Sequence, residues 1–254
     1  MEVKKGMILL AVVLGLSGCG LKTEVKTSMD SGLDNVEIDY YEKLIEAARE
    51  CILQSRDGKT SETYEFTPGE PGESLGYMIQ CSPKKDGELS EKYYISSVMM
   101  TPRSYEILGY LIQDIDGNGT DELIFGGNET GPDGARTGII YDIYTISDGK
   151  LVYVLNGWER NRYYLCNNGM IANEGSSGAA HSSYSYFTFE GSELHLVESV
   201  IYDGDKDRDN PWFHSTESEY DAKSAEPISE KRADEIREKY TYEYPAFIPF
   251  TEDN

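Results

Sequence analysis

The 254-residue chain has little positive charge and one substantial hydrophobic run. It carries 23 lysines and arginines against 46 aspartates and glutamates, a net charge of −23. A chain this acidic repels nucleic acids and anionic lipid headgroups, so nucleic-acid binding is excluded. The hydrophobic run, Met7–Leu16, is ten residues long. Because a helix that crosses a hydrocarbon core of about 30 Å needs about twenty residues, this run is too short to be a membrane span.

Cysteine is scarce, and its spacing excludes two kinds of site. The four cysteines form no C-x-x-C pair, so the sequence does not support a zinc site or a thioredoxin-like site. The three cysteines that follow Cys19 allow at most one disulfide. If one forms, Cys51 with Cys81 is the expected pair, but the favoured interpretation is that some or all of the three are buried free thiols that pack as small apolar groups.

The N-terminus has the three parts of a bacterial export signal. Lys4 and Lys5 precede the hydrophobic run, and Leu16-Ser17-Gly18-Cys19 follows it as a small-residue cleavage site. These four residues resemble the lipobox of bacterial lipoproteins. The resemblance implies that residues 1–18 are removed and that lipid on Cys19 anchors the protein to the outer face of the cell membrane. The alternative is an ordinary secretory signal with a chance cysteine. In the lipoprotein interpretation, residues 19–38 carry the lipid and form a flexible tether.

The first part of the domain is predicted to hold one helix and little regular structure after it. Asp39–Glu42 is typical of a capping box, and apolar residues at helical spacing predict a helix over Tyr40–Gln54. Prolines and glycines predict an irregular loop over residues 59–91, with one strand near Gly76–Cys81. The pattern over Lys92–Met100 fits either a strand or a helix.

From Ile107 onward, short runs rich in β-branched and aromatic residues alternate with turn dipeptides. Asp148-Gly149, Asn168-Gly169 and Glu190-Gly191 indicate tight turns between antiparallel strands. They predict three hairpins, namely Thr137–Ile146 with Leu151–Leu155, Arg162–Cys166 with Met170–Asn173, and Tyr184–Phe189 with Leu194–Tyr202. The predicted fold class is therefore mainly β, an antiparallel meander that is either an open sheet or partly propeller-like.

The C-terminal region predicts a second helix and a packed tail. Ser229 can cap a helix over residues 229–240. The tail Tyr242–Phe250 is too apolar for a free end, so we expect it to pack back onto the sheet as an extended edge. The expected architecture is a single β-rich domain over residues 39–254, flanked by one N-terminal and one C-terminal helix.

One motif between two expected strands indicates a cation site. Asp, Asn and Glu side chains alternate along it, and Gly117 and Gly119 permit the tight turn that would point their oxygens inward. Oxygen ligands of this kind suit Ca²⁺, which would have a structural role. The expected ligands are Asp114, Asp116, Asn118, the Thr120 carbonyl and Glu122. The alternative is a metal-free Asx-type turn.

The spacing of this motif resembles a known class of calcium loop. It is not an EF-hand, because Phe125 stands at position twelve, where that loop needs a glutamate. It instead resembles the calcium loops of FG-GAP and VCBS repeats, although those families repeat the loop and this chain has one clear copy. The order of export signal, acidic domain, calcium loop, hairpins and aromatic tail resembles a group of uncharacterised surface lipoproteins of Gram-positive bacteria. That resemblance implies location and architecture but no activity.

A second acidic segment is a weak candidate for another cation site. It lacks a glycine at its sixth position, and its ninth position is Pro211. Four alternating carboxylates are more typical of a water-facing turn. The segment comprises Asp203, Asp205, Asp207 and Asp209.

The sequence names no catalytic constellation. Gly175-Ser176-Ser177-Gly178 is not a G-x-S-x-G nucleophile elbow. The three histidines, His181, His195 and His214, are expected to be surface or sheet residues.

The leading hypothesis is therefore a membrane-tethered, calcium-stabilised, non-catalytic module that binds a glycan or a protein. Trp158, Trp212 and the many tyrosines would either form an aromatic platform for that ligand or pack the sheet. The alternative is an extracellular hydrolase acting on glycan or peptide, with Glu174–Ser183 as a loop over its cleft.

Overall fold

The structure is a computed structural model that describes residues 34–68, 78–84, 92–100, 105–130, 136–217 and 224–250. The expected export signal, Cys19 and most of the expected tether lie outside these residues. Within the described ranges, no helix is long and apolar enough to span a membrane.

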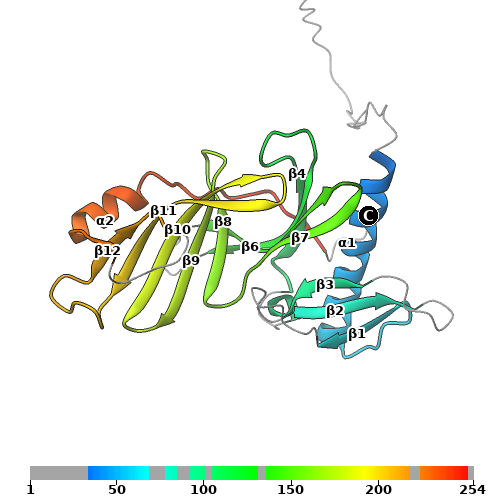
Figure 1. Cartoon of the computed structure of the whole chain (residues 1–254). Coiled ribbons are helices and arrows are strands. Elements are labelled where there is room, and N and C mark those ends of the chain that lie inside the picture. The colour runs from blue at the N-terminus through cyan, green and yellow to red at the C-terminus, as the bar shows by residue number, and fades with distance from the viewer. Residues whose placement is uncertain are drawn as a thin grey trace, which may run out of the picture. The chain divides into compact units, whose positions relative to one another are not determined.

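Strands dominate the described residues, and α-helices lie near both ends of them (Figure 1). The helices are α1 (Asp34–Asp57), the 3₁₀ helix η1 (Ser97–Met100) and α2 (Glu230–Arg237). The smaller sheet contains β1 (Tyr64–Pro68), β2 (Met78–Pro83) and β3 (Tyr93–Ser96). The larger sheet contains β4 (Leu108–Gln113), β5 (Glu122–Thr130), β6 (Arg136–Ser147), β7 (Lys150–Asn156), β8 (Asn161–Leu165), β9 (Ile171–Gly178), β10 (His181–Glu190), β11 (Glu193–Asp203), β12 (Trp212–Ser215), β13 (Glu226–Pro227) and β14 (Ile248–Pro249). The predicted fold class, mainly β with two flanking helices, is confirmed.

The larger sheet is an open antiparallel meander. Its strand order is β13-β12-β11-β10-β9-β8-β6-β5-β4-β14, and β7 pairs with β6 beside this path. The three predicted hairpins are confirmed as β6–β7, β8–β9 and β10–β11. Their turn glycines, Gly149, Gly169 and Gly191, all have positive φ, which explains why the dipeptides identified the turns.

The N-terminal part differs from the prediction in three places. Helix α1 begins at Asp34 rather than Tyr40, so Asp39 lies inside the helix instead of capping it. Strand β1 lies within residues 59–91, where a loop was predicted. Pro68 is tolerated there because it ends a strand at the edge of the smaller sheet. Residues Lys92–Met100 contain both a strand, β3, and a short helix, η1.

One hydrophobic core joins α1 to both sheets. Leu44 and Ile52 of α1 are completely buried, and they belong to the same cluster as Ile95 of β3. The cluster continues into the larger sheet through Phe125 of β5 and Tyr144 of β6, whose rings meet edge to face at 5.4 Å. The described residues of the two sheets therefore share one core.

A buried carboxylate also connects the two sheets. Asp142 of β6 is fully buried and accepts hydrogen bonds from Ser96 N (2.9 Å), Tyr153 OH (2.5 Å) and Asn156 Nδ2 (3.3 Å). Ser96 Oγ also donates to the Gly157 carbonyl at 2.9 Å. Burial raises the pKa of Asp142 to about 6, and the hydrogen bonds oppose this rise. The end of β3 is thus fastened to β6 through polar groups away from water.

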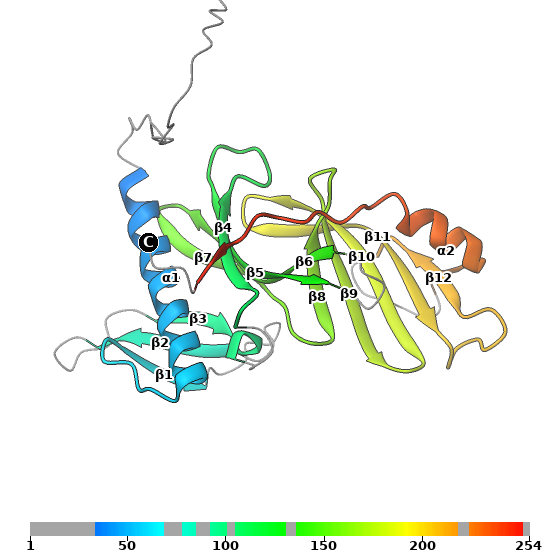
Figure 2. The same ribbon diagram turned by 180° about the vertical axis from the view of Figure 1, so that it is seen from behind.

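The C-terminal tail runs across the larger sheet, as predicted (Figure 2). It starts beside β8, where Tyr242 forms a bridge with Cys166. It ends as β14 beside β4, where Phe250 N donates to the Leu108 carbonyl at 3.2 Å. Arg49 Nε of α1 donates to the Phe250 carbonyl at 3.1 Å. The tail therefore links the middle of the sheet, its edge and the N-terminal helix.

Three glycines lie where the tail crosses the sheet: Gly109 on β4, Gly126 on β5 and Gly138 on β6. A Cβ on Gly126 would lie 2.4 Å from Phe247 Cζ, and one on Gly138 would lie 2.2 Å from Pro245 Cδ. Real Cβ atoms do not approach other atoms so closely. Glycine is required at these positions because the tail packs directly against the strand backbones.

Helix α2 is confirmed, with a shorter extent than predicted. Ser229 is its N-cap, and the side chain of Ser229 accepts a hydrogen bond from Arg232 N at 3.2 Å. The helix ends at Arg237, before the predicted end at residue 240. Ala233 and Ile236 form its buried face.

The candidate disulfide between Cys51 and Cys81 does not form. Cys51, Cys81 and Cys166 are all buried free thiols, which confirms the interpretation that the sequence favoured. Burial raises the pKa of Cys51 to about 12 and that of Cys166 to about 11. The thiols are therefore un-ionised at neutral pH and pack as small apolar groups.

Candidate metal centre

The predicted calcium loop closes the hairpin formed by β4 and β5. Gln113 pairs with Glu122, so Glu122 begins the second strand and the loop itself spans residues 114–121. Gly117 has a φ of 75° and Gly119 a φ of 91°, both in the left-handed region. A Cβ at either position would meet no atom within 4 Å. Backbone conformation rather than lack of space therefore selects glycine here.

Three of the predicted ligands converge. One carboxylate oxygen from each of Asp114, Asp116 and Glu122 lies within 4.8 Å of the others. Two oxygens on opposite sides of a Ca²⁺ ion, each about 2.3 to 2.6 Å from it, are about 4.6 to 5.2 Å apart. The spacing therefore fits a single cation. Within the described ranges, no other three His, Cys, Asp or Glu side chains come together in this way.

Asp114 organises the backbone of the loop. Its Oδ1 accepts hydrogen bonds from Gly117 N (2.7 Å) and Asn118 N (3.2 Å), and its Oδ2 accepts one from Gly119 N (2.9 Å). The hydrogen bond from Gly119 is the main cause of a lowered pKa for Asp114. Asp114 is therefore ionised at neutral pH, as a cation ligand must be.

Asn118 and Thr120, the other two predicted ligands, are bonded within the loop. Asn118 N and Nδ2 donate to the two carboxylate oxygens of Asp116, at 3.0 and 2.9 Å. Thr120 N donates to Asn118 Oδ1 at 2.6 Å. These bonds keep both residues beside the carboxylate cluster. They are also the bonds of an Asx-type turn, so the shape of the loop agrees with either interpretation of the motif.

Glu122 is completely buried, unlike the rest of the cluster. Its Oε2 accepts a hydrogen bond from Ile115 N and its Oε1 accepts one from Thr145 Oγ1, both at 3.0 Å. Burial raises the pKa of Glu122 to about 7, and the negative charges of Asp116 and Asp114 add to the rise. A cation would offset this accumulation of negative charge, so the donor set fits a hard divalent ion such as Ca²⁺.

The loop also contacts a distant hairpin, which sequence reasoning missed. Gly191 N, in the β10–β11 turn, donates to Asp116 Oδ2 at 2.7 Å. The two residues are 75 positions apart. No local pattern in the sequence could have indicated this contact, because it depends on how the sheet bends.

The second acidic segment forms a turn. Asp203 Oδ1 accepts a hydrogen bond from Lys206 N at 2.9 Å. Asp207 Oδ1 accepts hydrogen bonds from Asp209 N and Asn210 N, both at 3.0 Å. The acidic side chains of this segment do not form a convergent group of the kind seen in the β4–β5 loop. Asp205, Asp207 and Asp209 are exposed, as in a water-facing turn, whereas Asp203 is buried at the end of β11.

The predicted loop over Glu174–Ser183 is wrong. Most of this segment belongs to strands β9 and β10, which pair with each other and are joined by a two-residue turn. Ser176 Oγ donates to the carbonyls of Gly178 and His181, both at 3.3 Å. The segment is therefore part of the sheet. It is not the loop over a cleft that the hydrolase alternative required.

The three histidines occupy surface or sheet positions, as predicted. His195 is exposed on β11. His214 of β12 lies 3.1 Å from Glu198 Oε2 through its Nε2 atom, and His181 Nε2 lies 3.9 Å from Asp203 Oδ2. These are ion pairs between neighbouring strands when the histidines are protonated.

Several of the aromatic side chains that were considered for a ligand platform pack against other rings. Trp158 and Trp212 are both half-buried, and Trp212 meets Tyr202 edge to face at 5.2 Å. Two tyrosine pairs stack face to face, Tyr186 with Tyr240 at 3.6 Å and Tyr164 with Tyr242 at 4.3 Å. Their ring faces hold α2 and the tail to the sheet, which favours the packing interpretation for these residues.

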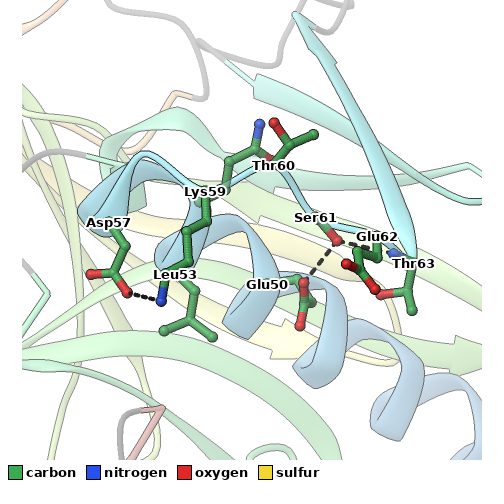
Figure 3. Close-up of a pocket in the computed structure, with 9 residues that line it drawn as sticks. Glu50, Leu53, Asp57, Lys59, Thr60, Ser61, Glu62 and Thr63 are labelled. Carbon is green, nitrogen blue, oxygen red and sulfur yellow. Dashed lines mark hydrogen bonds and ion pairs between the residues drawn. The ribbon is translucent and has the colours of Figure 1, made fainter.

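A surface pocket lies where α1 leads into β1 (Figure 3). Ser61 Oγ donates to Glu50 Oε2 at 2.7 Å, and Lys59 Nζ lies 3.3 Å from Asp57 Oδ2. The pocket shares no residue with the carboxylate cluster. Glu50, Asp57 and Lys59 each bond to a neighbouring residue, so these three charged groups do not indicate a particular ligand.

Comparisons with known proteins give no information on function. Neither a protein-family model nor a curated protein matches the chain. The chain is similar to a solved structure described as "Structure of a Xanthomonas Type IV Secretion System related protein". The identity is 16%, the match covers 65% of this chain and 85% of that chain, and the TM-score is 0.31. A likeness this distant supports no argument about function.

Proposed function

We propose that this protein is a membrane-tethered, extracytoplasmic lipoprotein whose β-rich domain is stabilised by calcium. We propose further that it is a non-catalytic module that binds a glycan or a protein. The observation that carries the calcium proposal is the convergence of Asp114, Asp116 and Glu122. The anchor proposal rests on Leu16-Ser17-Gly18-Cys19 and its place after the hydrophobic run.

Several residues of the loop would supply ligands to the ion. Asp114 and Asp116 would supply carboxylate oxygens from the loop, and Glu122 would supply one from the start of β5. Asn118 and the Thr120 carbonyl would supply further oxygens. A bound Ca²⁺ would offset the repulsion among three carboxylates and fix the connection between two strands of the larger sheet. In this role the ion acts on folding and performs no chemistry.

Two observations favour binding over catalysis. Ser176, in the segment considered for a hydrolase, donates to main-chain carbonyls. His214 is paired with Glu198 across neighbouring strands. These side chains take part in the hydrogen bonding of the sheet, where a nucleophile and its base would instead have to face a substrate.

Calcium is expected to raise the melting temperature of the mature protein. At a free concentration of about ten to one hundred times Kd, a ligand that binds the folded state alone adds about 1.4 to 2.7 kcal/mol, which corresponds to about 3 to 11 °C for a domain of this size. The measurement is a thermal melt followed by circular dichroism, in 10 mM Ca²⁺ (about ten times the weakest expected Kd) and in excess chelator.

Two sets of variants make this test specific. Asp114→Asn and Glu122→Gln keep the shape of the side chains and are expected to lose most of the calcium-dependent shift. Asp205→Asn and Asp207→Asn, in the second acidic segment, remove the same charge and should keep the shift. If melts of the wild-type protein in calcium and in chelator coincide, the calcium proposal is wrong.

Replacing Cys19 with alanine is expected to release the protein from the membrane. The wild-type protein, expressed in a bacterial host, should incorporate labelled palmitate and sediment with membranes. Cys19→Ala should do neither, because the thiol that carries the lipid is gone. Cys51→Ala is the matched control, since it removes a buried thiol and should stay lipidated. Equal labelling of Cys19→Ala and wild type would contradict the anchor.

A further inference from the structure

The β10–β11 hairpin bends part of the way along, and its outer part leaves the sheet. The pairing register shifts between Tyr186 and Phe187, which marks a β-bulge. Strand β9 accompanies β10 only as far as Phe187, and β12 meets β11 only from Ser199. Residues Thr188–Val197, which we call the distal arm, therefore form a two-stranded ribbon. Figure 1 shows this arm in yellow, reaching across the sheet toward β4.

Two kinds of contact hold the distal arm in place. Phe189 and Leu194 face each other across the ribbon, and both pack in the hydrophobic cluster that includes Ile115 of the β4–β5 loop. At the tip of the arm, Gly191 N donates to Asp116 Oδ2 at 2.7 Å. Because an isolated two-stranded ribbon is marginally stable in water, the position of the arm depends on these contacts.

Asp116 belongs to both the arm contact and the carboxylate cluster. The oxygen of Asp116 that is close to Asp114 and Glu122 experiences the repulsion of two like charges when no cation is present. A cation reverses that interaction and holds Asp116 against the cluster. Binding of the cation therefore also positions Asp116 Oδ2, the atom that accepts the hydrogen bond from Gly191 N.

We infer that the distal arm is a calcium-controlled flap, which closes on the β4–β5 loop when the carboxylate cluster holds Ca²⁺ and opens when the ion leaves. This inference rests on the proposed calcium site and names what the ion regulates there. Opening uncovers Phe189 and Leu194 together with the cluster beneath them. Calcium thus controls how much apolar surface this end of the sheet presents to a partner.

Hydrogen exchange of the mature protein, followed by mass spectrometry with and without Ca²⁺, tests the flap. Amides of residues 188–197 are expected to exchange at least tenfold faster in chelator than in calcium. Amides in the middle of β6 should change less, because β6 is flanked by strands on both sides. Calcium binding is measured on the same preparation by calorimetry.

Two variants separate the arm from the site. Leu194→Ser weakens the apolar contact of the arm and touches no predicted ligand, so it should bind Ca²⁺ normally while its arm exchanges faster than that of the wild type in calcium. Glu193→Gln changes an exposed neighbour on the same arm and should behave as the wild type.

The possible results distinguish the flap from the site. Calcium binding without a change in exchange at residues 188–197 would overturn the flap and leave the calcium site standing. If calorimetry detects no binding, the calcium site and the flap both fall. If the distal arm of Leu194→Ser exchanges as slowly in calcium as that of the wild type, the apolar contact does not hold the arm and the flap is wrong as described.

Discussion

Replacing Gly126 with valine is expected to lower the free energy of unfolding by about 3 kcal/mol, or about 6 to 12 °C in melting temperature. A Cβ at this position would lie 2.4 Å from Phe247 Cζ and 2.5 Å from the Ile139 carbonyl oxygen. The Phe247 ring belongs to the tail, and the Ile139 carbonyl belongs to the backbone of the neighbouring strand β6. The new side chain therefore displaces the tail or distorts the β5–β6 pairing.

Chemical denaturation gives the size of this loss, and limited proteolysis of the C-terminus shows whether the tail has lifted. Gly204→Ala is the matched control, because its nearest neighbour, Tyr202 Cε1, would lie at an ordinary contact distance of 3.4 Å. The control should stay within about 0.5 kcal/mol of the wild type. A Gly126→Val protein as stable as the control would show that the tail does not need the glycine.

The stability of the wild type relative to Asp142→Asn is expected to fall by about 2 kcal/mol between pH 4 and pH 7. Burial raises the pKa of Asp142 to about 6, from an ordinary value of 3.8. A folded-state pKa above the unfolded value means that the folded protein binds the proton more tightly. The contribution of Asp142 is therefore fully present below about pH 4 and is lost as the pH rises through 6.

Urea denaturation of the two proteins across this pH range measures the difference. Asparagine does not titrate, and the other ionisable groups, including Glu122, are common to both proteins and cancel. Asp205→Asn, which changes an exposed carboxyl, should show no such trend. If the free energy of unfolding of the wild type instead rises relative to that of Asp142→Asn as the pH rises, the hydrogen bonds from Ser96, Tyr153 and Asn156 outweigh the burial of the charge.

The part of the fold that the sequence predicted well is the part with local signals. Asp148-Gly149 and Asn168-Gly169 indicated tight turns because glycine readily takes the left-handed conformation, and both turns join the predicted strands. Ser229 marked the start of α2 for a similar reason, since its side chain satisfies a helix N–H. The prolines and apolar residues of the tail likewise indicated an edge strand.

The parts that were missed depend on partners far away in the sequence. Strand β1 contains no strong strand pattern, and it exists because β2 pairs with it. Helix α1 extends upstream of the capping box, although Asp39 and Glu42 fit that motif in isolation.

The candidate site was predictable in its ligands and not in its surroundings. Alternating oxygen-bearing residues and two glycines are a local pattern, so the convergence of Asp114 and Asp116 could be expected. The burial of Glu122 and its bond from Thr145 come from β6, a separate strand. The bond from Gly191 depends on the bulge that bends β10, which no short-range pattern encodes.

The path of the C-terminal tail sets the order in which this chain can finish folding. The hydrogen bond from Arg49 to the Phe250 carbonyl joins residues 201 positions apart. A ribosome releases the N-terminus first, so this bond and the edge formed by β14 cannot exist until residues 248–250 have emerged. Contacts of such long sequence separation also form slowly, because a large loop must close before they contribute. The larger sheet of the nascent chain therefore ends at β4, without the β14 edge, until residues 248–250 have been synthesised.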